Sequence, residues 1–198
     1  MAGGGDWAER GWLRLAGRLD TNALEQFRAL APEAGPGRRL SVDAVPDLLE
    51  GWNSELAAMG FDHQPRRAVF FHKSSEVNWS LPWHQDRVVT ETGTLRPREA
   101  PLQTLRRMAF AYVALDDVAA GGGGLQLAEG SHRFGMVRNK GVDRVLATTR
   151  VVRPELRAGE ALLVHMLTLH RSAVSETGAR RRSVRLDFGQ IEARCAAF

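Results

Sequence analysis

The residues best suited to chemistry in this 198-residue sequence are two histidines and an aspartate. His84 and Asp86 lie two residues apart in a stretch with the pattern of a β-strand, where alternate residues point to the same face. Both side chains can therefore reach one metal ion. His170 follows a strongly apolar run and offers a second imidazole. Two histidines and one carboxylate leave further coordination positions of an ion open, which is the arrangement of iron(II) oxygenases.

A run of three arginines at 180–182 begins the last predicted strand. A buried guanidinium can hold a ligand carboxylate through two parallel hydrogen bonds. Neighbours on a strand point to opposite faces, so the facing of the strand decides which arginine points inward. If Val184 and the apolar residues that alternate with it face inward, Arg180 and Arg182 do so too. Alternation on that facing therefore favours Arg180 or Arg182, whereas the spacing from His170 favours Arg181. For Arg181 to point inward, the strand must turn its other face to the pocket or contain a bulge.

Each of these signals also has an ordinary structural explanation. A histidine beside an apolar strand is usually part of the core, and runs of arginine usually lie in solvent. The order of the three segments strengthens the functional interpretation, because Arg181 follows eleven residues after His170. The remaining histidines are expected to be structural, namely His63, His72, His132 and His165.

Length and composition predict one globular domain spanning 1–198. Hydrophobic residues make up 43% of the chain and charged residues 25%, which is ordinary for a globular protein. No apolar run approaches the roughly 18 residues of a membrane-spanning helix, and no signal peptide is visible at the N-terminus. Cys195 is the only cysteine, which excludes an internal disulfide. We therefore expect a cytoplasmic protein that does not bind membranes.

The basic isoelectric point near 10.1 raises the question of nucleic-acid binding. The formal net charge is only +4, and the arginines that supply most of the positive charge are interleaved with acidic residues. Proteins that bind phosphate backbones usually concentrate their basic residues on one face. Nucleic acid is therefore not an expected partner.

The first part of the chain, 1–65, is predicted to be mainly helical and to pack on the rest. Asn22 and Glu25 have the spacing of a capping box at the start of one helix. A second helix is expected to start at Pro46 and to stop at Gly60. The stretch 32–37 is rich in glycine and proline and predicts a loop between them.

The second part, 66–190, has the pattern of a β-sheet core. Short apolar runs separated by turn residues are typical of a sandwich or barrel. The fold class is therefore mainly β with flanking α-helices. The expected strands are 68–71, 81–89, 108–115, 125–128, 144–152, 161–169 and 183–188.

Longer motifs over roughly 66–190 resemble the phytanoyl-CoA dioxygenase-like family of iron(II)/2-oxoglutarate-dependent oxygenases. The resemblance implies a double-stranded β-helix, a cupin-like jelly roll with the metal inside its open end. The motifs that carry it are Phe71-His72-Lys73, Asn78-Trp79, Trp83-His84-Gln85-Asp86, the segment from Gly124 to Arg133, His170-Arg171-Ser172 and Arg181.

The resemblance also implies roles for individual residues. His84, Asp86 and His170 match the iron ligands, and Arg181 matches the arginine that binds the distal carboxylate of 2-oxoglutarate. The intact Asp86 argues against a halogenase, in which that carboxylate is replaced. Further residues expected in the cosubstrate pocket are Ser172, Lys73, Asn78 and Trp79, and Arg87 is a candidate for substrate binding.

The activity implied is that of a dioxygenase that uses Fe(2+), 2-oxoglutarate and dioxygen and releases succinate and carbon dioxide. Hydroxylation of a small molecule, such as an amino acid or a natural-product intermediate, is the default outcome. Two alternatives stay open: a cupin-like iron enzyme that does not use 2-oxoglutarate, and a catalytically silent binding domain of the same fold. The sequence specifies neither the substrate nor the oligomeric state.

Overall fold

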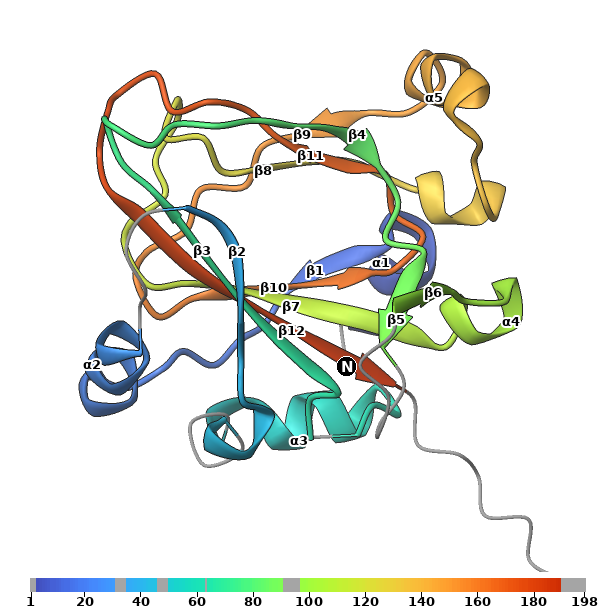
Figure 1. Cartoon of the computed structure of the whole chain (residues 1–198). Coiled ribbons are helices and arrows are strands. Elements are labelled where there is room, and N and C mark those ends of the chain that lie inside the picture. The colour runs from blue at the N-terminus through green and yellow to red at the C-terminus, as the bar shows by residue number, and fades with distance from the viewer. Residues whose placement is uncertain (1–2, 31–34, 46–49, 63, 91–96, 190–198) are drawn as a thin grey trace, which may run out of the picture.

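Two antiparallel sheets face one another across the centre of the molecule, and helices cover the outer side of the larger one (Figure 1). The structure is a computed structural model that describes residues 3–30, 35–45, 50–62, 64–90 and 97–189. The mainly β fold with flanking helices expected from the sequence is confirmed. Among the described residues, no helix has the length and apolar character needed to cross a membrane.

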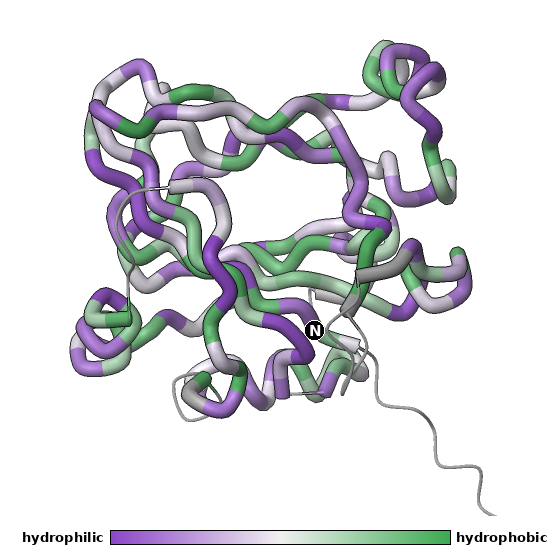
Figure 2. The backbone as a smooth tube through the Cα atoms, viewed as in Figure 1, coloured by the Kyte–Doolittle hydropathy of each residue, from purple (hydrophilic) through white to green (hydrophobic). Residues whose placement is uncertain are grey.

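The larger sheet has six strands and supplies one wall of the central space. Its middle strands are long, apolar and buried on both faces, as expected for a sheet covered on both sides, and Figure 2 shows this hydrophobic band along the centre of the sheet. In spatial order its strands are β1 (Trp12–Arg14), β10 (Ala161–His165), β7 (Met108–Ala114), β12 (Arg181–Gly189), β3 (Arg67–Lys73) and β2 (Gly35–Leu40).

The smaller sheet lies opposite and carries the candidate ligands at one end. Its four strands are shorter than the middle strands of the larger sheet, and a separate two-stranded ribbon lies in the chain between the first of them and the other three. The four strands are β4 (Leu81–His84), β11 (His170–Ser172), β8 (Leu125–Ala128) and β9 (Val151–Val152), and the ribbon consists of β5 (Val88–Thr90) and β6 (Pro97–Glu99).

Strand β12 separates two different environments. Val184, Leu186 and Phe188 belong to the apolar core between the larger sheet and the helices. Of the two facings considered from the sequence, the strand therefore adopts the one that Arg181 requires. Their side of the sheet is covered by helices, which leaves the alternate residues Arg181 and Arg185 to face the smaller sheet and its pocket. No bulge is needed, because the register of β12 with both neighbours is regular.

The N-terminal part contributes three helices, α1 (Gly3–Arg10), α2 (Thr21–Ala29) and α3 (Glu50–Ala58). The N-cap of α2 is Asp20, whose carboxylate accepts a hydrogen bond from Ala23 N at 2.7 Å, so the capping box predicted at Asn22 was wrong. Asp20 and Asn22 are both good capping residues, and the burial of Ala23 and Leu24 fixes the earlier start. The predicted helix start at Pro46 lies outside the described residues.

The same part also supplies two strands, which the sequence analysis missed. β1 and β2 form the two edges of the larger sheet. β2 begins at Gly35, inside the stretch expected to be a loop. Its neighbour β3 provides backbone groups to pair with, and pairing of this kind overrides weak local propensity.

Three predicted strands also require correction. The run 144–152 begins in a helix, α5 (Asn139–Leu146), because Val142, Val145 and Leu146 pack together at helical spacing against Leu169. The run 161–169 ends as a strand at His165 and turns before β11. The run 81–89 is divided between β4 and β5. Three short helices complete the described elements, η1 (Val42–Ala44), α4 (Leu102–Leu105) and η3 (Ser131–Phe134).

The packing of α2 on the sheet gives a prediction for stability. Phe27 is fully buried in the core that also contains the apolar face of β12, so Phe27→Ala should lower the free energy of unfolding by about 3–5 kcal/mol. Phe134→Ala is the matched control, because 56% of Phe134 is exposed and its loss should change stability by less than about 0.5 kcal/mol. Urea titration followed by circular dichroism measures both, and equal effects would contradict this description of the core.

Candidate metal centre

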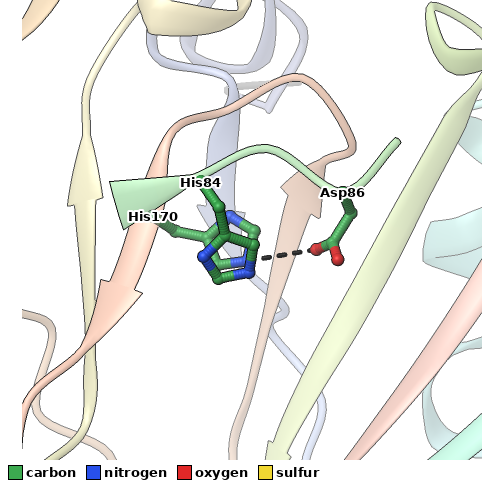
Figure 3. A group of neighbouring side chains, drawn as sticks. All are labelled: His84, Asp86 and His170. Atoms are coloured by element: carbon green, nitrogen blue, oxygen red, sulfur yellow. Dashed lines mark ion pairs between the residues drawn. The ribbon is translucent and has the colours of Figure 1, made fainter. Parts of the chain in front are cut away.

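His84 and His170 are direct partners across the antiparallel pair β4–β11. His84 is the last residue of β4, His170 is the first of β11, and Asp86 lies just beyond the end of β4. Cross-strand partners on one face lie about 5 Å apart. Figure 3 shows the two imidazoles against one another and the Asp86 carboxylate facing them.

The spacing of the three side chains fits one ion. One ligand atom from each residue lies within 4.8 Å of the others, and His170 Nε2 lies 3.1 Å from Asp86 Oδ2. When two ligand atoms each lie about 2.1 Å from an ion and subtend a right angle at it, they are roughly 3 Å apart. The distance between His170 Nε2 and Asp86 Oδ2 matches this separation. This group is the only such cluster found among the described residues.

Both imidazoles are oriented by backbone carbonyl groups. His84 Nδ1 lies 2.7 Å from Pro82 O, and His170 Nδ1 lies 2.9 Å from Thr168 O. A proton on each Nδ1 satisfies these hydrogen bonds and leaves each Nε2 with a lone pair for a metal, the arrangement usual for histidine ligands. Burial and the neighbouring His170 lower the pKa of His84, which favours the neutral form that binds metals.

Asp86 is held in its ionised form. Burial by itself raises the pKa of this carboxyl, but the guanidinium of Arg185 and the imidazole of His170 outweigh it and hold the pKa well below its usual value. A carboxylate that is already ionised needs no proton removal before it binds a cation. The electrostatics of the centre therefore suit a divalent metal.

Gln85, which stands between the two ligands in the sequence, fixes the end of β4. Its amide nitrogen donates to the carbonyl oxygens of Gly135 and Leu167 at 2.8 and 2.7 Å. Its amide oxygen accepts from Val137 N at 2.7 Å. These bonds join the ligand segment to two other loops. Sequence reasoning missed this role, although alternation already places Gln85 on the face opposite His84.

A pocket of about 430 Å³, including its open mouth, adjoins the histidines. Arg181 lies in this pocket with only 3% of its surface exposed. Its Nη1 donates to Tyr112 Oη at 2.6 Å, while its buried Nε has no hydrogen-bond partner among the described residues. Arg182 points away and forms a two-pronged ion pair with Asp116. The structure thus places Arg181, and not Arg182, beside the candidate metal centre.

Three more of the residues predicted for the cosubstrate pocket lie in or beside it. Ser172 lines the pocket, and the fully buried Lys73 donates from Nζ to Ser172 Oγ at 2.9 Å and to Ala173 O. Burial and the nearby Arg181 lower the pKa of Lys73 to about 7. The ring of Trp79, also in the pocket, lies 4.6 Å from Lys73 Nζ.

Two predicted site residues are engaged elsewhere. Asn78 exchanges two hydrogen bonds of 2.8 Å with the backbone of Ser175 and is not among the residues that line the pocket. Arg87 lies 3.6 Å from Glu99, next to the β5–β6 ribbon. Their proposed roles in cosubstrate and substrate binding remain predictions.

The other histidines have different surroundings. His132 Nε2 lies 3.2 Å from Ala8 O in α1, and His165 packs against His132 with the rings tilted and their centroids 5.0 Å apart. Neither belongs to the candidate metal cluster. His63 lies outside the described residues.

Arg185 is the most important residue that sequence reasoning missed at this site. Its Nη1 lies 2.5 Å from Asp86 Oδ2, and its side chain also lines the pocket. A signal for it was present, since Arg181 and Arg185 are four residues apart on one strand and therefore share a face. Tyr112 and Phe110 of β7 complete the same wall.

Comparison of the sequence with protein-family models gives a result consistent with this geometry. The family model described as phytanoyl-CoA dioxygenase (PhyH) matches residues 14–183. The chain belongs to this family. Comparison with curated proteins gives no match.

Several solved structures share the fold at low sequence identity. AviO1 from Streptomyces viridochromogenes Tue57 is 21% identical with a TM-score of 0.68, and the match covers 95% of this chain and 93% of AviO1. SnoN, described as a non-haem α-ketoglutarate-dependent epimerase from nogalamycin biosynthesis, is 17% identical with a TM-score of 0.67 and coverage of 94% and 81%. EctD from S. alaskensis in its apo form is 13% identical with a TM-score of 0.69 and coverage of 94% and 75%. The cupin-like double-stranded β-helix is therefore confirmed.

The geometry predicts that each histidine is needed to hold a metal. His84→Ala or His170→Ala should weaken metal binding by more than roughly a hundredfold, which is beyond the loss typical for an outer-sphere partner. His132→Ala is the control, because this histidine contacts α1 and not the centre. Anaerobic titration with iron(II), monitored by calorimetry, measures the iron affinity of all three variants. Wild-type affinity in either ligand variant would show that the residue is not a ligand.

Proposed function

We propose that this PhyH-family protein is a non-haem iron(II), 2-oxoglutarate-dependent oxygenase that acts on a small molecule. One observation carries the proposal above the others. The two histidines of the cluster line the same pocket as Arg181, a buried arginine whose Nε has no hydrogen-bond partner among the described residues. One cavity thus contains side chains suited to bind a metal and a side chain suited to bind an anionic ligand.

His84, Asp86 and His170 are the residues that would hold the iron. Their donor set suits iron(II), and three protein ligands leave room for other molecules on an octahedral ion. The bound iron would supply the reaction with dioxygen, which protein side chains cannot perform. The chain's own part is to hold the ligands in place and to enclose the reacting groups in a largely apolar pocket.

Arg181 is the residue proposed to bind the distal carboxylate of 2-oxoglutarate. Burying a carboxylate without a partner costs several kcal/mol, so a dicarboxylate needs a fixed cation at the end remote from the metal. Arg181 Nη1 donates to Tyr112 Oη at 2.6 Å, and Nε has no partner in the part of the chain that the structure describes. Lys73 lies nearby and adds positive charge, while its Nζ donates to Ser172 Oγ and the Ser172 hydroxyl donates to Gly123 O.

Hydroxylation is the proposed reaction, with succinate and carbon dioxide released. The same fold also serves a protein described as an α-ketoglutarate-dependent epimerase and another described as a carbocyclase, both from nogalamycin biosynthesis. A natural-product intermediate therefore belongs in the first substrate panel, along with amino acids. A cytoplasmic location and the absence of nucleic-acid partners remain part of the proposal.

Anaerobic titration of iron(II) and then 2-oxoglutarate tests the function directly. Binding of 2-oxoglutarate to the iron form should produce a visible absorption band that neither component gives alone. A substrate screen should then raise succinate release. Iron binding without any 2-oxoglutarate effect would instead favour a cupin-like iron enzyme, and binding of both without turnover on any substrate would favour a silent binding domain.

Comparison of three arginine variants tests the cosubstrate site. Arg181→Ala should raise the KM for 2-oxoglutarate roughly tenfold or more, as expected for the loss of a charge-assisted hydrogen bond of about 1.5–3 kcal/mol, with iron affinity nearly unchanged. Arg182→Ala, in the same strand, and Arg180→Ala, at the exposed residue just before it, are matched controls. An effect confined to Arg182→Ala would mean that the wrong arginine was chosen, and no effect in any variant would remove the case for 2-oxoglutarate.

Lys73 gives the site a predicted pH dependence. Its pKa of about 7 lies below the usual 10.5, so the side chain is charged below pH 7 and becomes neutral above it. The affinity for the 2-oxoglutarate dianion should therefore fall as pH rises from 6 to 9, by up to about tenfold per unit. Lys73→Met should bind more weakly at pH 6 and lose most of this dependence. Isothermal calorimetry across this range checks both, and the same slope in the variant would contradict the role of Lys73.

A further inference from the structure

Four buried side chains of alternating charge lead away from the candidate metal centre. Asp86 contacts Arg185 at 2.5 Å, Arg185 Nε donates to Asp187 Oδ1 at 2.6 Å, and Arg67 Nε donates to Asp187 Oδ2 at 2.7 Å. We call this set the ion chain. No more than 19% of any of the four side chains is exposed. Because desolvated charges are costly, a set of this kind persists only when every member is paired.

Arg185 is fixed more firmly than its pairing with Asp86 alone would achieve. Its guanidinium carbon lies 4.3 Å from the ring centre of Phe110, and its Nη2 contacts Met166 Sδ at 3.4 Å. Asp187 occupies Nε from the other side. The planar group is therefore held against a ring, a sulfur atom and a carboxylate, so its positive charge is fixed beside Asp86.

Arg185 and the metal-binding histidine His170 both lie close to the same oxygen of Asp86. Oδ2 is the atom that lies 2.5 Å from Arg185 Nη1 and 3.1 Å from His170 Nε2. A carboxylate oxygen has lone pairs for two partners, so contact with the arginine leaves one for an ion. The contact also fixes the rotation of the carboxylate, because an unrestrained carboxylate turns about its χ2 angle over a broad range.

We propose that Arg185 is a positioning residue that holds Asp86 Oδ2 at its place in the metal centre, and that Asp187 and Arg67 hold Arg185. This inference rests on the proposed function, since it requires Asp86 to be a metal ligand. Arg185 thereby acts on the metal through Asp86 without touching the ion.

The positive charge of Arg185 would also repel a metal ion bound nearby, and the acidic members of the ion chain reduce this repulsion. Arg185 lies between Asp86 and Asp187, so its charge is balanced before any ion binds. The orienting effect should then exceed the repulsion. If Arg185 instead competed with the metal for Asp86, its removal would strengthen metal binding, so the sign of the change distinguishes the two roles.

Cobalt(II) provides a spectroscopic probe that needs no turnover. Arg185→Gln should weaken cobalt affinity by roughly ten- to hundredfold, the range typical for loss of an outer-sphere partner, and should alter the visible bands of the bound ion. Asp187→Asn should weaken affinity in the same direction by a smaller factor, since Arg185 stays in place. Arg182→Gln is the matched control, because it removes an arginine of the same strand from a largely buried ion pair with Asp116. The cobalt affinity of this variant should stay within about twofold of the wild-type value.

The variants separate positioning from a merely structural role. A structural role would lower the unfolding temperature of Arg185→Gln while its folded fraction kept wild-type cobalt affinity and bands, and that result would overturn the inference. Tighter binding would overturn it as well. If Arg185→Gln fails to fold, Arg185→Lys decides, because a single ammonium cannot contact Asp86 and Asp187 as the guanidinium fork does; weaker binding supports the inference and unchanged binding overturns it. A wild-type protein that binds no cobalt would overturn the metal centre itself and this inference with it.

Discussion

The burial of β12 on both faces is the constraint on which the site depends. This strand lies between β7 and β3 in the larger sheet. One face packs Val184, Leu186 and Phe188 under the helices. The helices remove that face from the interior of the barrel, so the other face must line the pocket, and its charged residues must be paired within the fold. The apolar half of the strand thus secures the position of its charged half.

The metal centre draws on a second constraint, the pairing of β4 with β11. Two segments 86 residues apart in the sequence meet so that His84 and His170 are direct partners. The strands are short, and side-chain bonds reinforce them: Gln85 joins the end of β4 to Gly135, Val137 and Leu167. The ligands therefore come from strand ends held on several sides. This suits a site that has to keep its geometry while a cosubstrate enters and leaves.

Local sequence patterns were reliable where one physical cue dominated. The apolar runs that became β7 and β8 were predicted to within one residue, because nearly continuous burial leaves a continuous signal. The patterns failed where partners far along the chain decided the outcome. β2 is a strand because β3 lies beside it, whereas the valines after Asn139 belong to a helix because they pack around Leu169. Neither neighbour is visible in a short window of sequence.

The sequence by itself determined the identities and the order of the chemical groups: two histidines, a carboxylate and a cluster of arginines with family-like spacing. It also placed His84 and Asp86 two residues apart near the end of one strand. Only the tertiary structure decided which arginine enters the pocket, because a strand's alternation gives two equivalent facings until the helices cover one of them. It alone brought Arg185 to Asp86 across 99 positions of the chain, since an ion pair between distant segments depends on where the sheets place them and not on local periodicity.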